Sequence, residues 1–249
     1  MTQTALHAYL AIYLKDKLIY KNWFFPAFLL GSILPDIDYF FSQLDKLIHV
    51  PIQLSLVNKT FMHSLITTTL IYLLLLIIYE LKKNKKLLNL ANGIATGLLL
   101  HIFIDLTIFL KPLNIFWPLP INSIQLSTFN IPYYIYKLTM VLEFVLFRAF
   151  ASYTIHAILN YPSKNSYLIN IQSYWMKFEL FFIIIFISSS YYLSMDKLFI
   201  IFFVGYIPSI LTMVYTIVKA WDSLNYYPKI EDSNETTDIK ERDNLININ

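Results

Sequence analysis

The residues best suited to chemistry lie in the stretch His101-Ile-Phe-Ile-Asp105. This imidazole and this carboxylate are four residues apart, so a helix places them on one face. The surrounding segment is apolar and long enough to cross a bilayer, where ionisable groups are costly and usually face a partner or a cavity. A metal ion held by both groups would account for the pair. An intrahelical hydrogen bond that helps a helical bundle to pack accounts for the spacing equally well.

Two other segments carry side chains of the same kind. Asp36 and Asp38 follow Pro35, which disturbs a helix, so a broken turn could let both carboxylates converge. A solvated turn at a helix end is the simpler interpretation of Asp-x-Asp. His63 directly precedes Ser64, a suitable N-cap for the next helix, and alone it would be read as interfacial. Together, these groups offer the oxygen and nitrogen ligands that hard and borderline cations bind.

The elements that must position these residues are membrane-spanning helices. The chain is 57% hydrophobic and 14% charged, whereas soluble domains hold about 25% charged residues, so a bilayer is the better solvent. A short apolar helix is expected near 4–14, and long hydrophobic segments are expected near 22–41, 64–81, 87–110, 138–160, 178–195 and 198–218. The sequence therefore predicts an all-α, multi-pass integral membrane bundle with one transmembrane domain over residues 1–221.

Residues 222–249 differ from the rest because they are polar and rich in Asp and Glu. Such a segment cannot bury enough apolar surface to order itself, which predicts a disordered acidic tail on the cytoplasmic side. The absence of cysteine excludes disulfides, thiolate metal sites and cysteine nucleophiles. Basic residues are not interleaved with aromatic residues as in nucleic-acid platforms, so no nucleic acid partner is expected, and the oligomeric state stays unknown.

The turn at 82–86, Lys-Lys-Asn-Lys-Lys, is the densest charge cluster outside the tail. The positive-inside rule predicts that it is cytoplasmic. At 1.5 Å rise per residue, His101 lies roughly 21 Å from this turn, and Asp105 and His63 lie about 27 Å from it. These groups are therefore expected in one layer toward the extracytoplasmic side.

The depths of two further candidates, Asp36 and His7, are measured from other lysines. If Lys21 marks the inner surface, Asp36 lies about 22 Å up its segment, in the same layer. His7 rises only about 12 Å from Lys15, so its level is left open.

Three features of the other segments bear on packing. Gly93 and Gly97 form a small-xxx-small pattern, which lets helices approach closely and would bring the helix of His101 against a neighbour. Glu143 and Arg148 share one span, where they could pair with each other, or Glu143 could reach the polar layer. Residues 111–137, rich in proline and aromatic residues, are expected either to cover that layer or to form a plain interfacial loop.

Taken in chain order, these elements resemble the YdjM-like family of inner-membrane-associated proteins, which are predicted to be metal-dependent hydrolases. The elements that carry the resemblance are His7, Gly31-xxx-Pro35-Asp36-Ile-Asp38, His63-Ser64, His101-xxx-Asp105-Leu-Thr107 and Trp117-Pro118. The resemblance covers roughly residues 4–150. The sequence departs from the family pattern where Asn58-Lys59 replaces the usual His-Arg, where Met62 precedes His63, and where a glycine before Trp-Pro is missing. The resemblance still carries an implication. It implies a multi-pass inner-membrane protein with a metal-dependent hydrolase activity on a poorly defined substrate.

We therefore expect a hydrolase whose divalent metal, Zn²⁺ or Mn²⁺, activates a water to attack an ester or phosphoester. The expected metal ligands are His7, Asp36, His63, His101 and Asp105, and Asp38 is the expected general base. The depth of the site favours a lipid-like or membrane-proximal substrate. The alternative is a non-catalytic ion or proton pathway, or a scaffold, in which the same side chains are conductive or structural. A pathway strings polar groups along the depth, and the near-absence of ionisable residues in the last two spans favours the hydrolase.

Overall fold

The computed structural model describes residues 3–18, 21–36, 61–107, 112–124, 133–160 and 167–225. Within these ranges the regular secondary structure is helical, apart from one isolated antiparallel bridge between Leu113 and Ile124. The long helices are α4 (Leu65–Lys82), α5 (Lys85–Thr107), α6 (Tyr133–Asn160), α7 (Leu168–Ser190) and α8 (Met195–Lys219). All five are long and apolar enough to cross a membrane. The expected all-α, multi-pass membrane bundle is confirmed.

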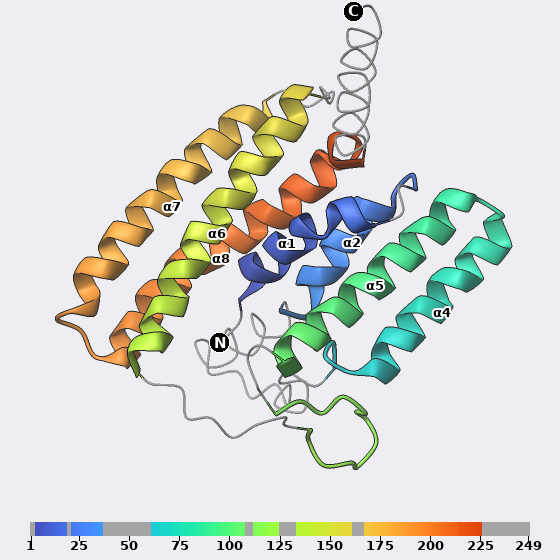
Figure 1. Ribbon diagram of the computed structural model, residues 1–249, viewed down its shortest axis with the longest axis horizontal. Helices are drawn as coiled ribbons and strands as arrows, with labels where there is room; N and C mark the ends of the chain where they lie inside the picture. The colour runs from blue at the N-terminus through green and yellow to red at the C-terminus, as the bar shows by residue number, and fades with distance from the viewer. Residues whose placement is uncertain are drawn as a thin grey trace, which may run out of the picture.

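Two short helices lie in the centre of the molecule. They are α1 (Thr4–Tyr13) and α2 (Phe24–Ile33), each of ten residues. Figure 1 shows them between the α4–α5 hairpin on one side and the α6–α7–α8 bundle on the other. A ten-residue helix is about 15 Å long, half the hydrocarbon thickness, so neither α1 nor α2 crosses the bilayer alone.

The α1–α2 hairpin has two distinct ends. Its turn carries the short 3₁₀ helix η1 (Lys15–Lys17), and in Figure 1 this turn lies toward the same end of the molecule as the α4–α5 turn. At its open end, the Thr4 hydroxyl donates a hydrogen bond to Asp36 Oδ2 over 2.8 Å. The hairpin therefore places the start of α1 and the end of the second helix at one level inside the bundle.

Two of the expected segments have different bounds in the structure. The segment expected at 22–41 is a helix from Phe24 to Ile33, followed by the 3₁₀ helix η2 (Leu34–Asp36), because Pro35 lacks the amide hydrogen that continues an α-helix. The segment expected from 178 begins at Leu168. Polar residues such as Gln172 lower the hydropathy of its first turns, so the sequence pattern places the start of this segment too late.

Gln172 belongs inside α7 because its side chain is buried and hydrogen-bonded. Its Nε2 donates to Thr216 Oγ1 over 2.6 Å, and its Oε1 accepts from Thr154 Oγ1 over 3.1 Å. Polar side chains that bond across helices are stable in a membrane bundle. The polarity of this turn therefore stabilises the packing of α6, α7 and α8.

Helices α2 and α5 pack with their backbones almost in contact. A Cβ atom on Gly97 would lie 2.4 Å from the Phe28 carbonyl oxygen, and one on Gly31 would lie 2.4 Å from the Ile94 carbonyl oxygen. Gly93 approaches the first turn of α2 in the same way, with the nearest backbone oxygen 2.5 Å from an added Cβ. The close approach expected from Gly93 and Gly97 is present, and α2 is the neighbour of the helix that carries His101.

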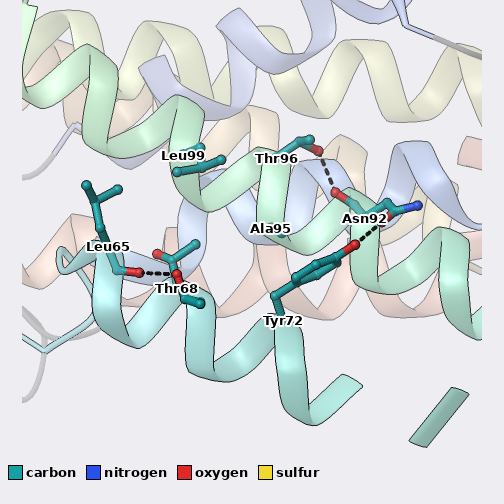
Figure 2. Close-up of a pocket in the computed structure, with 8 residues that line it drawn as sticks. Leu65, Thr68, Tyr72, Asn92, Ala95, Thr96 and Leu99 are labelled. Carbon is teal, nitrogen blue, oxygen red and sulfur yellow. Dashed lines mark hydrogen bonds between the residues drawn. The ribbon is translucent and has the colours of Figure 1, made fainter. Parts of the chain in front are cut away.

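A cavity of about 320 Å³ lies in the seam between α4 and α5. Figure 2 shows Tyr72 and Asn92 near one end of this seam and Ala95 between the two helices. The Tyr72 hydroxyl donates to Asn92 Oδ1 over 3.0 Å, and the Thr96 hydroxyl donates to the Asn92 carbonyl over 2.7 Å. The eight residues that line the cavity include no His, Asp or Glu, so it is not where the candidate chemistry lies.

The described part of the chain ends in a short helical turn, at residues 221–225. Leu224 is fully buried, and the Asn225 side-chain oxygen accepts a hydrogen bond from the Trp23 amide. The first residues of the segment expected to be a disordered tail therefore pack against the helical domain. Residues 226–249, the rest of that segment, lie outside the described residues.

Candidate metal centre

Four segments of the chain bring five ionisable side chains together. His7 comes from α1, Asp36 from η2, His63 from the residues before α4, and His101 and Asp105 from α5. Each of the five residues is at most 2% exposed. They form two groups, His7–His101–Asp105 and Asp36–His63–His101, and in each group the possible ligand atoms lie within 4.8 Å of one another. We call these five residues the His/Asp cluster.

The separations within the His/Asp cluster are those of atoms that could surround one cation. Asp105 lies between two imidazoles, with Oδ1 at 3.3 Å from His7 Nε2 and Oδ2 at 3.6 Å from His63 Nε2. His101 Nε2 lies 3.3 Å from His63 Nε2 and 3.9 Å from Asp36 Oδ1. Ligand atoms bound about 2.1 Å from a tetrahedral ion lie about 3.4 Å apart. The cluster therefore needs little rearrangement to hold a metal.

The orientation of His101 is fixed by α2. Its Nδ1 lies 2.8 Å from the carbonyl oxygen of Ser32, and a carbonyl only accepts, so Nδ1 carries the hydrogen. The lone pair of Nε2 is then directed at the cluster. Metal-binding histidines commonly donate their other ring N–H to a carbonyl or carboxylate in this way. The ring of His7 stacks on that of His101 with the centroids 3.8 Å apart, which holds both rings in place.

Asp36 is oriented by a hydroxyl pair that the sequence reasoning missed. Thr4 donates to Asp36 Oδ2, and its hydroxyl also lies in hydrogen-bond contact with the Tyr206 hydroxyl of α8. This leaves Asp36 Oδ1 on the side of His101. Thr4 could have been found from its spacing, because it lies three residues before His7 on the same helical face. Tyr206 carries no such signal among the many aromatic residues of its span.

His63 is held at the start of α4. Ser64 caps that helix, as expected, by accepting from the Ile66 amide over 3.1 Å. The same hydroxyl contacts the outer connection, where it donates to the Trp117 carbonyl over 2.6 Å. Ile115 of that connection is buried against the end of the α4–α5 hairpin. The described part of the connection, residues 112–124, therefore packs directly beside His63.

Glu143 and Arg148 have different partners in the structure. Glu143 is 1% exposed, and its Oε1 accepts a hydrogen bond from the Ala5 amide of α1 over 2.8 Å. The guanidinium of Arg148 donates to the Met176 carbonyl on α7 over 2.6 Å. Of the two arrangements expected for Glu143, the structure shows the one in which it reaches toward the polar layer.

Helix α7 contains a buried carboxylate that the sequence reasoning also missed. Glu179 is fully buried and accepts hydrogen bonds from Ser209 and Trp175. With the span expected from 178, this residue would lie at a membrane edge, but α7 begins at Leu168 and Glu179 lies in its interior. Ionisable groups are few in the last two spans, as expected, but Glu179 of α7 is buried inside the bundle. Glu179 belongs to neither group of the His/Asp cluster.

Two sequence-based expectations fall outside the described residues. Asp38, the expected general base, is one of them, and Asn58-Lys59, the pair that departs from the family pattern, is the other.

Comparison with known proteins gives one finding that covers most of the chain. The family model described as YdjM inner membrane protein matches residues 1–211. No curated protein and no solved structure matches.

Proposed function

Since this chain belongs to the YdjM inner membrane protein family, we propose that it is a metal-dependent hydrolase of that membrane. The bond it cleaves is an ester or phosphoester of a lipid-like or membrane-proximal molecule. The observation that carries this proposal is the convergence of five buried imidazole and carboxylate groups, from four segments, on one small volume.

A bound cation explains this convergence better than packing does. Two carboxylates, those of Asp36 and Asp105, are at most 2% exposed, and the groups that face them in the described ion pairs are imidazoles, which carry a positive charge only when protonated. A buried carboxylate without a cation loses its hydration and is strongly disfavoured in its charged form. A divalent ion would compensate both charges. The mixed nitrogen and oxygen ligands suit Zn²⁺ or Mn²⁺.

The alternative, an ion or proton pathway, predicts a different arrangement. A pathway needs polar groups spaced along the depth of the membrane, whereas the five groups gather in two overlapping sets whose ligand atoms lie within 4.8 Å of one another. Glu179 and Gln172 do add buried polar groups to the bundle, but Gln172 bonds to Thr154 and Thr216 and not to the cluster. The gathered arrangement favours a centre at which a ligand is held.

The residues of the cluster have distinct parts in the proposed reaction. A divalent metal, when bound, polarises the substrate and lowers the pKa of a water ligand toward about 7. His101 presents a fixed Nε2 lone pair. Asp105 directs one carboxylate oxygen at His7 and the other at His63. Asp38 stays the proposed general base. The cluster lies near the end of α5 that is remote from the turn at 82–86, which supports a substrate held close to one membrane face.

We expect the purified protein to hydrolyse a membrane lipid ester or phosphoester only when Zn²⁺ or Mn²⁺ is supplied. The protein would be placed in lipid nanodiscs, and released product would be followed by mass spectrometry with and without a chelator. A protein that binds the metal at the cluster but releases no product from a broad lipid panel would contradict the hydrolase and support the scaffold. Ala95→Leu, which extends a side chain into the α4–α5 cavity, whose lining holds no member of the His/Asp cluster, is the control that should leave the metal requirement unchanged.

The orientation of the chain is a separate proposal. Lysines cluster at the α4–α5 turn, so this turn is expected in the cytoplasm and the cluster toward the other face. A cysteine introduced by Asn84→Cys has no native cysteine to compete with it. It should stay unlabelled by an impermeant thiol reagent in intact cells and become labelled after permeabilisation. Full labelling in intact cells would show that the α4–α5 turn lies outside the cytoplasm, which is the opposite orientation.

A further inference from the structure

Helix α1, which carries His7, begins inside the bundle without a cap of its own. Its N-cap residue Gln3 makes no side-chain capping bond, and its first turn contains no acidic residue. The first amides of any helix have no partner within that helix. In a membrane, where water cannot replace the partner, such amides must be satisfied by another part of the protein.

Glu143 of α6 supplies this missing partner. Its Oε1 lies 2.8 Å from the Ala5 amide nitrogen, and the residue is 1% exposed. A carboxylate at a helix N-terminus is also favoured by the helix dipole. Glu143 therefore caps α1 from a different helix, across the contact between α1 and α6.

The capped turn holds two components of the His/Asp cluster. The His7 amide donates to the Gln3 carbonyl over 3.1 Å, so His7 lies one helical turn from the capped end. Thr4, next to Ala5, donates to Asp36. Fraying of this turn would displace the His7 ring and remove the hydrogen bond that orients Asp36.

We propose that Glu143 is a positioning residue of the metal centre, an inference that rests on the proposed metal-dependent function. It acts through the first turn of α1, and it sets the place of His7 against His101 and Asp105. It is not itself one of the metal ligands, because it belongs to neither group of atoms within 4.8 Å.

The bundle offers a matched control in Glu179. It is the same residue type, it is also fully buried, and it accepts hydrogen bonds from Ser209 and Trp175 rather than from α1. Glu143→Leu therefore removes a buried carboxylate together with the α1 cap, whereas Glu179→Leu removes a buried carboxylate from the same bundle and leaves the cap in place. Glu143→Gln keeps an acceptor oxygen and is the conservative variant.

The test measures two quantities in the full-length protein in nanodiscs. Amide hydrogen exchange of residues 3–7, without metal, reports the cap, and the Kd for Zn²⁺ reports the centre. For Glu143→Leu we expect exchange at least about tenfold faster and a Kd about 10- to 100-fold weaker. For Glu143→Gln, the exchange rate and the Kd should both stay within about threefold of the wild type, a smaller change than the loss of an outer partner causes. Glu179→Leu should leave both unchanged.

Three results would overturn the inference. They are unchanged exchange in Glu143→Leu, faster exchange with an unchanged Kd, and a loss in Glu143→Gln as large as in Glu143→Leu. If the wild type binds no Zn²⁺, the metal centre itself is wrong, while the exchange experiment still decides whether Glu143 caps α1. If Glu143→Leu does not insert, Glu143→Met replaces it as an unbranched side chain of similar length.

Discussion

Asp105→Asn is expected to weaken Zn²⁺ or Mn²⁺ binding by about 100-fold or more, beyond what the loss of an outer partner costs. The carboxylate of Asp105 contacts both His7 and His63, so it links the two halves of the cluster. Asparagine keeps the shape but provides no negative charge to the cation. His101→Ala should have at least as large an effect, because His101 belongs to both groups of possible ligands. Metal content and a titration of the metal-free protein would measure the loss.

His156→Ala is the matched control for these variants. His156 is an exposed imidazole on α6, and its Nδ1 bonds only to the Ser152 carbonyl of its own helix among the contacts described. This variant should bind metal like the wild type.

Wild-type protein should also unfold at a higher temperature when metal is added, because a ligand of the folded state stabilises it, and Asp105→Asn should lose that shift. Wild-type metal binding in both Asp105→Asn and His101→Ala would show that the cluster is a packing network.

Gly97→Ala is expected to destabilise the protein by about 1–3 kcal/mol or more, because it overpacks a contact between two backbones. The added Cβ would lie 2.4 Å from the Phe28 carbonyl oxygen and 2.7 Å from the Ser32 amide nitrogen, so α2 must move away from α5. That movement separates the Ser32 carbonyl from His101, and metal affinity should fall together with stability. Thermal unfolding and a Zn²⁺ titration would measure the two effects.

Gly205→Ala separates this effect from a general intolerance of glycine replacement. A Cβ there would meet the ring of Phe182 at 2.5 Å and that of Phe144 at 2.9 Å, and these are side chains that can shift. We expect lower stability and a much smaller loss of metal affinity than in Gly97→Ala, because Gly205 lies beside Tyr206 but does not set the approach of α2 to α5. If Gly97→Ala kept the wild-type affinity, the approach of α2 would not be what orients His101.

The components of the fold that depend on local sequence could be predicted. The apolar composition and segment lengths indicate a helical membrane bundle, and spacing indicates that His101 and Asp105 share a face. The pattern of Gly93 and Gly97 indicates a close helix contact, although it does not name the partner. In each case the information lies within one helix, where the period of 3.6 residues converts spacing into direction.

The components that depend on contacts between distant segments could not be predicted. The level of His7 is an example, because it follows from the hydrogen bond between Thr4 and Asp36, 32 positions apart. The cap that Glu143 provides to Ala5 joins residues 138 positions apart. Nothing in the residues around Glu143 indicates that its partner is a backbone amide of α1, since any buried donor would satisfy a carboxylate.

The half-length hairpin of α1 and α2 has a consequence for biogenesis. Each of its helices spans about 15 Å, so the hairpin cannot act as an independent transmembrane unit when it leaves the ribosome. Its final place needs α5 against α2 and Glu143 of α6 against α1, and both are synthesised later. The α1–α2 hairpin therefore settles only after helices that follow it in the chain are in place. The proposed metal centre would therefore reach its full affinity only after α6 has entered the membrane and Glu143 has capped α1.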